Sequence, residues 1–140
     1  MTQRSNTPSM LDDVAEFHTK VLQVLPSESP TLVSQEYIIE RGRFLSEEVE
    51  EFIQAGMTGN IVDVADALAD IIYVALGTAH MMGLPFQAIW DLVQAANMKK
   101  VRGMTKRGNP NDAMKPEGWV SPEPGIAALI LRRINEAPLD

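Results

Sequence analysis

The stretches Leu45-Ser-Glu-Glu-Val-Glu-Glu-Phe52 and Asp63-Val-Ala-Asp-Ala-Leu-Ala-Asp70 decide the fold of this chain. Both have the apolar spacing of a helix, and a turn containing glycine separates them, so we expect two neighbouring helices. Together the stretches hold seven of the nineteen acidic residues. Carboxylates from facing helices suit Mg²⁺ or Mn²⁺, which commonly bridge to substrate phosphates. The pattern therefore indicates phosphate chemistry.

The apolar spacing elsewhere predicts an all-α fold, with a four-helix core, a short C-terminal helix and no strands. The helix that contains the second stretch is apolar nearly all round and is expected to be buried. It needs more cover than three short neighbours supply, so we expect a homodimer or homotetramer. We expect one domain over residues 1–140, with a loose start at 1–8 and a basic loop at 102–121. The expected helices cover about 9–25, 34–55, 61–82, 85–101 and a short segment after Ser121.

The composition limits the classes of function. The chain has 140 residues, is 45% hydrophobic and carries a net charge of −7, which argues against a nucleic-acid binder. It has no cysteine, so neither a disulfide framework nor a thiolate nucleophile is available. No apolar run is long enough for a membrane span, and the first residues lack the pattern of a signal peptide. We expect a cytoplasmic protein.

The first acidic run has two sides. An apolar stripe on the helix places Glu48 and Glu51 at its edge, whereas Glu47 and Glu50 point to the far side. Glu48 and Glu51 are therefore the better candidates for metal ligands, although a solvated acidic face is an equally good account of the run taken alone. The stripe consists of Ile38, Leu45, Val49 and Phe52.

The second acidic run places three carboxylates on a mostly apolar helix. Asp63, Asp66 and Asp70 lie within an arc of about 60° at 100° per residue. Buried carboxylates are unfavourable unless they are paired, protonated or bound to metal, and no Lys or Arg between residues 44 and 98 could pair with them. Asp63 also fits a helix cap with Asn60. The pattern favours metal binding for Asp66 and Asp70.

A basic segment follows the acidic centre. Six of the twelve Lys and Arg residues lie between Lys99 and Lys115. The amide of Asn97 and the ammonium groups of this segment could bind phosphate. A polar helix end and a solvated loop explain the same residues. Trp119 fits a lid, a base-stacking residue or an apolar anchor. The candidate substrate-binding residues are Asn97, Lys100, Lys106, Arg107, Lys115 and Trp119. His18 is expected on a helix surface without a role.

These residues resemble the motifs of the MazG-like, all-α nucleoside triphosphate pyrophosphohydrolases, from about residue 17 to 124. The Glu-Glu-x-x-Glu motif of that family matches Glu47 to Glu51, and Asp70 matches the last residue of its Glu-x-x-Asp motif. Asn97-Met-Lys-Lys100 is similar to its nucleotide-binding element, and Met114-Lys-Pro-Glu-Gly-Trp119 to the closing segment of single-domain phage and bacterial members. One position departs from the pattern, because Ala67 stands where the family has glutamate; Asp66, or else Asp63, is the expected substitute.

The resemblance implies Mg²⁺-dependent hydrolysis of a nucleoside triphosphate to the monophosphate and pyrophosphate, with Mn²⁺ able to replace Mg²⁺. It implies metal ligands at Glu48, Glu51, Asp66 and Asp70, a catalytic pair at Glu47 and Glu48, and a site completed by a second copy of the chain. Relatives act on dUTP, on mixed nucleotide pools, or on dGTP in phages. The alternatives are a phosphoribosyl-ATP pyrophosphohydrolase and, outside enzymes, a helical oligomerisation module.

Overall fold

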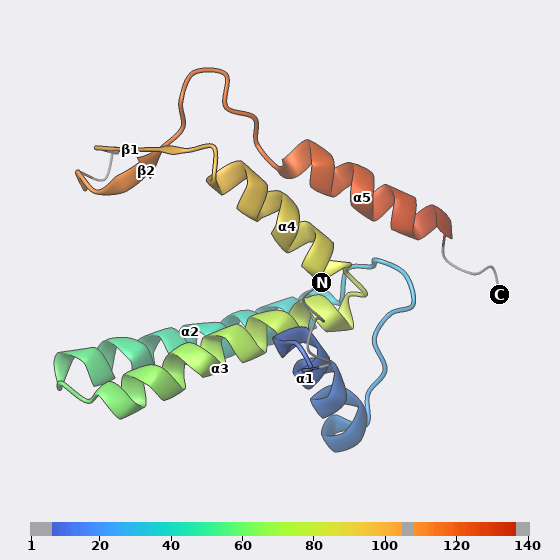
Figure 1. The fold of residues 1–140 in the computed structure, drawn as a ribbon. Coiled ribbons are helices and arrows are strands. Elements are labelled where there is room, and N and C mark those ends of the chain that lie inside the picture. Colours follow the sequence, from blue (N-terminus) through green and yellow to red (C-terminus); the bar gives the residue numbers. More distant parts are fainter. Residues whose placement is uncertain (1–6, 105–107, 137–140) are drawn as a thin grey trace. The chain divides into compact units, whose positions relative to one another are not determined.

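The fold is mostly α-helical, as the sequence predicts, and a computed structural model describes residues 7–104 and 108–136 (Figure 1). The chain divides into two compact units, residues 1–84 and 85–140. The first contains α1 (Met10–Phe17), a π-helix η1 (His18–Leu22), α2 (Gln35–Met57) and α3 (Ile61–Met81). The second contains α4 (Phe86–Asn97), strands β1 (Val101–Gly103) and β2 (Asp112–Met114), and α5 (Glu123–Glu136).

Helices α2 and α3 form an antiparallel hairpin and pack along each other (Figure 1). Ser34 caps α2 by accepting the N–H of Tyr37 at 3.1 Å. Gly59 takes a positive φ of 72° in the turn, a conformation that glycine adopts without strain. Asn60 then caps α3 through its side chain, which accepts the N–H of Asp63 at 3.1 Å. The turn thereby sets the two acidic runs on adjoining helices.

Helix α1 begins as predicted but ends differently. Ser9 and Asp12 form the expected reciprocal capping box. The helix widens into η1 after Phe17 and ends at Gln23, which has a left-handed φ of 56°, so the predicted continuation to Pro26 is wrong. Regular 3.6-residue periodicity cannot reveal a π-helical turn, which changes the direction of every later side chain.

His18 lies in the core, with 2% of its surface exposed, so its predicted surface position is wrong. Its ring packs against α3, because His18 lies four residues after the buried Val14 and faces Gly77 and His80. Its Nδ1 donates to the backbone oxygen of Val14 at 2.9 Å, which leaves Nε2 as an unpaired acceptor in the neutral ring. The packing is tight, because a Cβ at Gly77 would lie 2.8 Å from Cε1 of His18 and 2.9 Å from Nη2 of Arg41. Only glycine fits there.

A pair of histidines makes the first unit sensitive to acid. The ring of His80 lies 5.2 Å from that of His18, its Nε2 is buried without a partner, and burial, then the nearness of His18, lowers its pKa below the ordinary 6.5. Protonation is thus easier in the unfolded chain, so stability is lost as the pH falls below about 6.5. We expect the thermal midpoint to be lower at mildly acidic pH than at neutral pH. The decrease should be smaller in His80→Gln.

Glu48 titrates in the opposite sense, since a raised carboxyl pKa favours the folded state as the pH falls. The test is therefore the difference between the wild type and His80→Gln at each pH, measured by thermal melting. An identical pH dependence in the two proteins would show that His80 is not the acid-sensitive group.

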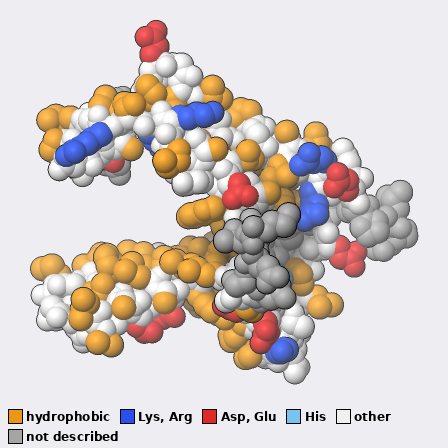
Figure 2. All heavy atoms as spheres, viewed as in Figure 1, with side chains coloured by type: hydrophobic (Ala, Val, Ile, Leu, Met, Phe, Trp, Pro, Cys, Tyr) orange, Lys and Arg blue, Asp and Glu red, His pale blue; other side chains and the backbone are white. Residues whose placement is uncertain are grey.

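Helix α3 is not buried all round, contrary to the prediction. Ala67, Gly77 and Ala79 are its buried residues, because α1 and α2 are the elements of the first unit that contact it. Figure 2 shows hydrophobic side chains along the surface of the α2–α3 hairpin. The large exposed apolar residues of the two helices are Ile38, Ile39, Phe44, Val49, Ile53, Met57, Ile61, Val62, Leu68, Ile72 and Tyr73.

The second unit consists of two packed helices joined by a small hairpin. Pro85 precedes α4, which begins close to the predicted residue 85, and Trp90 of this helix is 58% exposed. Helix α5 packs on α4, where a Cβ at Gly125 would lie 3.5 Å from a methyl group of Leu92. The segment expected to be a loop contains the antiparallel pair β1 and β2, with Arg102 opposite Ala113. Strands of three residues are too short to show alternation in the sequence.

Candidate metal and phosphate site

Glu48 is the most unusual acidic residue of α2. It is half-buried, whereas Glu47, Glu50 and Glu51 are exposed, so Glu51, which was predicted beside Glu48 at the edge of the apolar stripe, is not buried with it. Its Oε2 atom is buried and has no hydrogen-bond partner. A buried acceptor without a donor is unfavourable unless a ligand or a proton satisfies it. Glu48 is therefore the acidic residue of α2 that most needs a proton or a cation.

The electrostatic surroundings of Glu48 connect the two acidic runs. Burial raises the pKa of its carboxyl group, and the charges of Glu51, Asp70 and Asp66 raise it further. The two helices therefore bring Glu51, Asp66 and Asp70 close enough to repel a charge on Glu48. A divalent cation would relieve that repulsion.

The carboxylates of α3 differ in their surroundings. Asp70 is half-buried and Asp66 is exposed. Asp63 is held by Asn60, whose side-chain amide donates to its Oδ2 at 2.7 Å, so Asp63 serves the helix cap. Ala67 lies between Asp66 and Asp70 in the chain, with 2% of its surface exposed. The position where the related motif has glutamate is thus occupied by a core residue.

A hollow of about 350 Å³ opens beside this cluster, at the end of the α2–α3 hairpin. Acidic side chains from both helices line it, together with polar side chains of α2 and the turn. It is polar enough to admit water and phosphate oxygens. The lining residues are Glu51, Gln54, Ala55, Thr58, Asp63 and Asp66.

The donor set fits a hard cation such as Mg²⁺. Within the described ranges, no group of three or more His, Asp or Glu side chains is arranged so that it could hold a metal ion. Mg²⁺ does not require such a cage, because it usually takes one or two carboxylates and completes its shell with water and substrate phosphates. The unpaired Oε2 of Glu48 beside Glu51 and Asp70 provides that kind of partial site.

The candidate phosphate-binding residues lie in the second unit. Asn97 ends α4 and is exposed, and its backbone oxygen accepts the N–H of Lys100 at 3.0 Å. Trp119 is half-buried, and its indole N–H donates to the backbone oxygen of Ala96 at 2.8 Å. Lys100 and Lys115 both approach the Trp119 ring. Lys106 and Arg107 lie outside the described residues.

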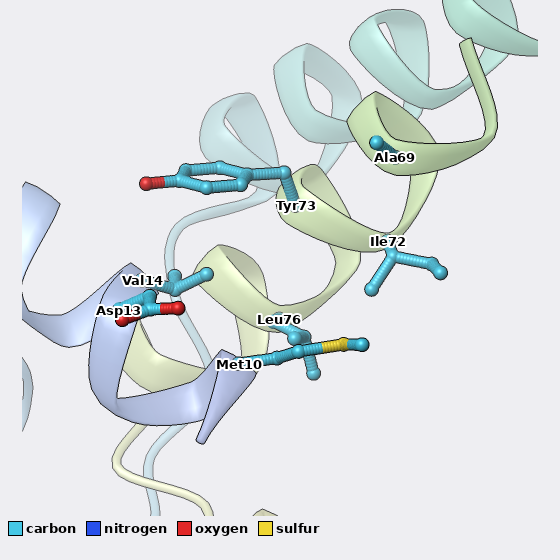
Figure 3. Close-up of a pocket in the computed structure, with 7 residues that line it drawn as sticks. All are labelled: Met10, Asp13, Val14, Ala69, Ile72, Tyr73 and Leu76. Atoms are coloured by element: carbon cyan, nitrogen blue, oxygen red, sulfur yellow. The ribbon is translucent and has the colours of Figure 1, made fainter. Parts of the chain in front are cut away.

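A second cavity, of about 270 Å³, lies between α1 and α3 (Figure 3). Its lining is almost wholly apolar, with the Asp13 carboxylate and the Tyr73 hydroxyl as its polar groups. None of the predicted site residues lines this pocket, so it is not a candidate for phosphate chemistry. Its apolar lining makes it part of the uncovered apolar surface. It is lined by Met10, Asp13, Val14, Ala69, Ile72, Tyr73 and Leu76.

The described helices include none that combines the length and the apolar character needed to cross a membrane.

A helical fold with facing carboxylates on two adjoining helices is the architecture of the all-α pyrophosphohydrolases. Residues 14–97, more than half of the chain, match the sequence model of the phosphoribosyl-ATP pyrophosphohydrolase family, so the chain belongs to that family. The family is part of the MazG-like all-α NTP pyrophosphohydrolase superfamily, and the chain is accordingly a nucleotide pyrophosphohydrolase. No curated protein matches the sequence.

Proposed function

We propose that this protein hydrolyses a nucleoside or deoxynucleoside triphosphate to the monophosphate and pyrophosphate with Mg²⁺, in control of the cytoplasmic nucleotide pool. The observation that carries the proposal is the buried, unpaired Oε2 of Glu48, set among the charges of Glu51, Asp66 and Asp70. Membership of a pyrophosphohydrolase family supports the reaction type.

Each residue has a proposed role. Glu48, Glu51, Asp66 and Asp70 are the candidate ligands, of which one or two would hold the cation together with water and substrate phosphates; when bound, the cation neutralises phosphate charge and makes a water molecule more acidic. Glu47 is exposed beside Glu48 and would take the proton from the attacking water. Asn97, Lys100 and Lys115, with Lys106 and Arg107, would bind the polyphosphate, since ammonium and guanidinium groups form charge-assisted hydrogen bonds with phosphate oxygens.

Two groups of substrates are candidates. The closing segment from Met114 to Trp119 favours free nucleotides such as dUTP, or dGTP in a phage. The family match favours phosphoribosyl-ATP as the second candidate, because its description names that substrate and it spans the acidic runs. Both reactions release pyrophosphate from a triphosphate chain, so the same carboxylates would serve either one.

Product analysis with a substrate panel tests the proposal. The panel contains the common NTPs and dNTPs, dUTP and phosphoribosyl-ATP, each with and without Mg²⁺. We expect pyrophosphate and a nucleoside monophosphate in equal amounts, in the presence of Mg²⁺ alone. Release of orthophosphate would contradict the reaction type. A lack of turnover on every substrate would favour a helical oligomerisation module.

We also propose that the protein is a homodimer or homotetramer. The exposed apolar side chains of α2 and α3, together with the apolar pocket of Figure 3, form a surface that the rest of the first unit does not cover. A second copy of the same helices would cover it. We expect light scattering at micromolar concentration to give a multiple of the 15.4 kDa chain mass. A mass of one chain would contradict the proposal.

A further inference from the structure

Two lysines of the second unit place their ammonium groups over the indole ring of Trp119. The Nζ of Lys100 is 5.2 Å from the ring centroid, and the Nζ of Lys115 is 5.1 Å from it. Both distances are within the range of a cation–π interaction, which stabilises an ammonium group over an aromatic face. All three residues lie beyond residue 97, where the family match ends.

Local structure fixes the ring. The N–H of Trp119 donates to the backbone oxygen of Pro116 at 3.0 Å, and Gly118 takes a φ of 77°, so the residues from Pro116 to Trp119 form a tight turn. That turn brings Lys115 back toward the ring. The indole N–H binds Ala96 at the end of α4, which places the ring beside Lys100. Two separate chain segments thus meet at one side chain.

Two ammonium groups held around one ring repel each other, and a carboxylate would normally offset that repulsion. Among the described residues, neither Lys100 nor Lys115 forms an ion pair, and Lys20 with Glu16 is the pair that the structure shows. The arrangement therefore has a positive charge that an anion with several oxygens could neutralise. A ring whose N–H is already bonded and whose surroundings are cationic suits this role better than base stacking.

We propose that Trp119 is a positioning residue that holds Lys100 and Lys115 as a paired clamp for the polyphosphate of the substrate. The proposal rests on the proposed function for the identity of the ligand, but the clamp itself can be measured with an inorganic anion. Lys99 is a matched control, because it is adjacent to Lys100 in the chain and exposed, whereas the ammonium groups over the ring belong to Lys100 and Lys115. If anion binding came from general positive charge or from the dipole of α4, it would depend on Lys99 as much as on Lys115.

The test is calorimetric titration of the full chain with inorganic tripolyphosphate in the absence of metal. We expect Lys115→Met to weaken binding about tenfold, equivalent to about 1.4 kcal/mol, and Lys99→Met to leave it unchanged. Trp119→Phe, which keeps an aromatic face, should retain most of the affinity, whereas Trp119→Leu should lose it. Adding Lys115→Met to Trp119→Leu should cause little further loss, because the tryptophan acts through the lysine.

Equal losses in Lys115→Met and Lys99→Met would overturn the clamp, and so would independent, additive effects of Trp119 and Lys115. If Trp119→Leu does not fold, the comparison of the two lysine variants and Trp119→Phe decides the question. Tripolyphosphate binding that depends on Lys115 without any nucleotide turnover would sustain the clamp and refute the proposed function. Turnover with a KM unchanged by Lys115→Met would sustain the proposed function and refute the clamp.

Discussion

Replacing Glu48 by glutamine is expected to lower kcat/KM for pyrophosphate release by roughly 100-fold or more without unfolding the protein. Glutamine keeps the shape of the side chain and removes the charge that would hold the cation. Burial and the charges of Glu51, Asp70 and Asp66 already disfavour the ionised carboxylate, so a neutral side chain should leave the thermal midpoint unchanged or raise it. Loss of activity with retained stability is the signature of a functional carboxylate.

The matched control is Glu50→Gln. Glu50 lies on the same helix, is exposed, and is not among the residues that line the hollow; its carboxylate accepts from the side-chain amide of Gln54 at 3.4 Å. We expect its kinetics and thermal midpoint to match the wild type. Full activity in Glu48→Gln, or an equal loss in both variants, would remove Glu48 from the site.

Replacing Ala67 by glutamate is expected to destabilise the fold by about 3 kcal/mol or more, because an unpaired charge would be buried. Ala67 is 2% exposed, and Asp66 and Asp70 are close in the chain, so the new carboxylate would be shielded from water and would add negative charge beside theirs. Restoring the family pattern should therefore not raise activity. Chemical denaturation measures the effect, and Ala67→Gln separates the added volume from the added charge.

Asp66 is expected to replace the glutamate ligand that the family has at the Ala67 position. We expect Asp66→Asn to reduce turnover about as strongly as Asp70→Asn, while Asp63→Asn, which changes a cap residue, should have a smaller effect. Unchanged turnover in Asp66→Asn, together with stronger Mn²⁺ binding in Ala67→Glu, would show that the second motif is a degraded site.

Local signals predicted the helices well where a cap or a stop residue marks each end. Ser34, Asn60 and Gly83 set the limits of α2 and α3 to within a few residues. The position of Glu48 at the edge of the apolar stripe also followed from 100° per residue alone. The choice of Glu48 and Glu51 as ligands of α2 stays a prediction, and the half-burial of Glu48 is the observation in line with it.

The features that the sequence did not reveal depend on contacts between distant segments. The burial of His18 requires the space that Gly77 of α3 leaves for its ring. The meeting of Lys100 and Lys115 at Trp119 requires the turn after β2, and each residue alone looks like ordinary surface. Apolar periodicity identifies a helix face that needs to be buried, but it does not say whether the same chain or a second copy buries it.

Direct titration with Mn²⁺, followed by electron paramagnetic resonance, tests the central claim that the carboxylates of α2 and α3 hold a divalent cation. The titration compares the wild type with Glu48→Gln and Glu50→Gln, and needs no substrate turnover. We expect the wild type and Glu50→Gln to bind Mn²⁺ alike, and Glu48→Gln to bind it at least about tenfold more weakly. Equal binding by all three proteins would contradict the claim.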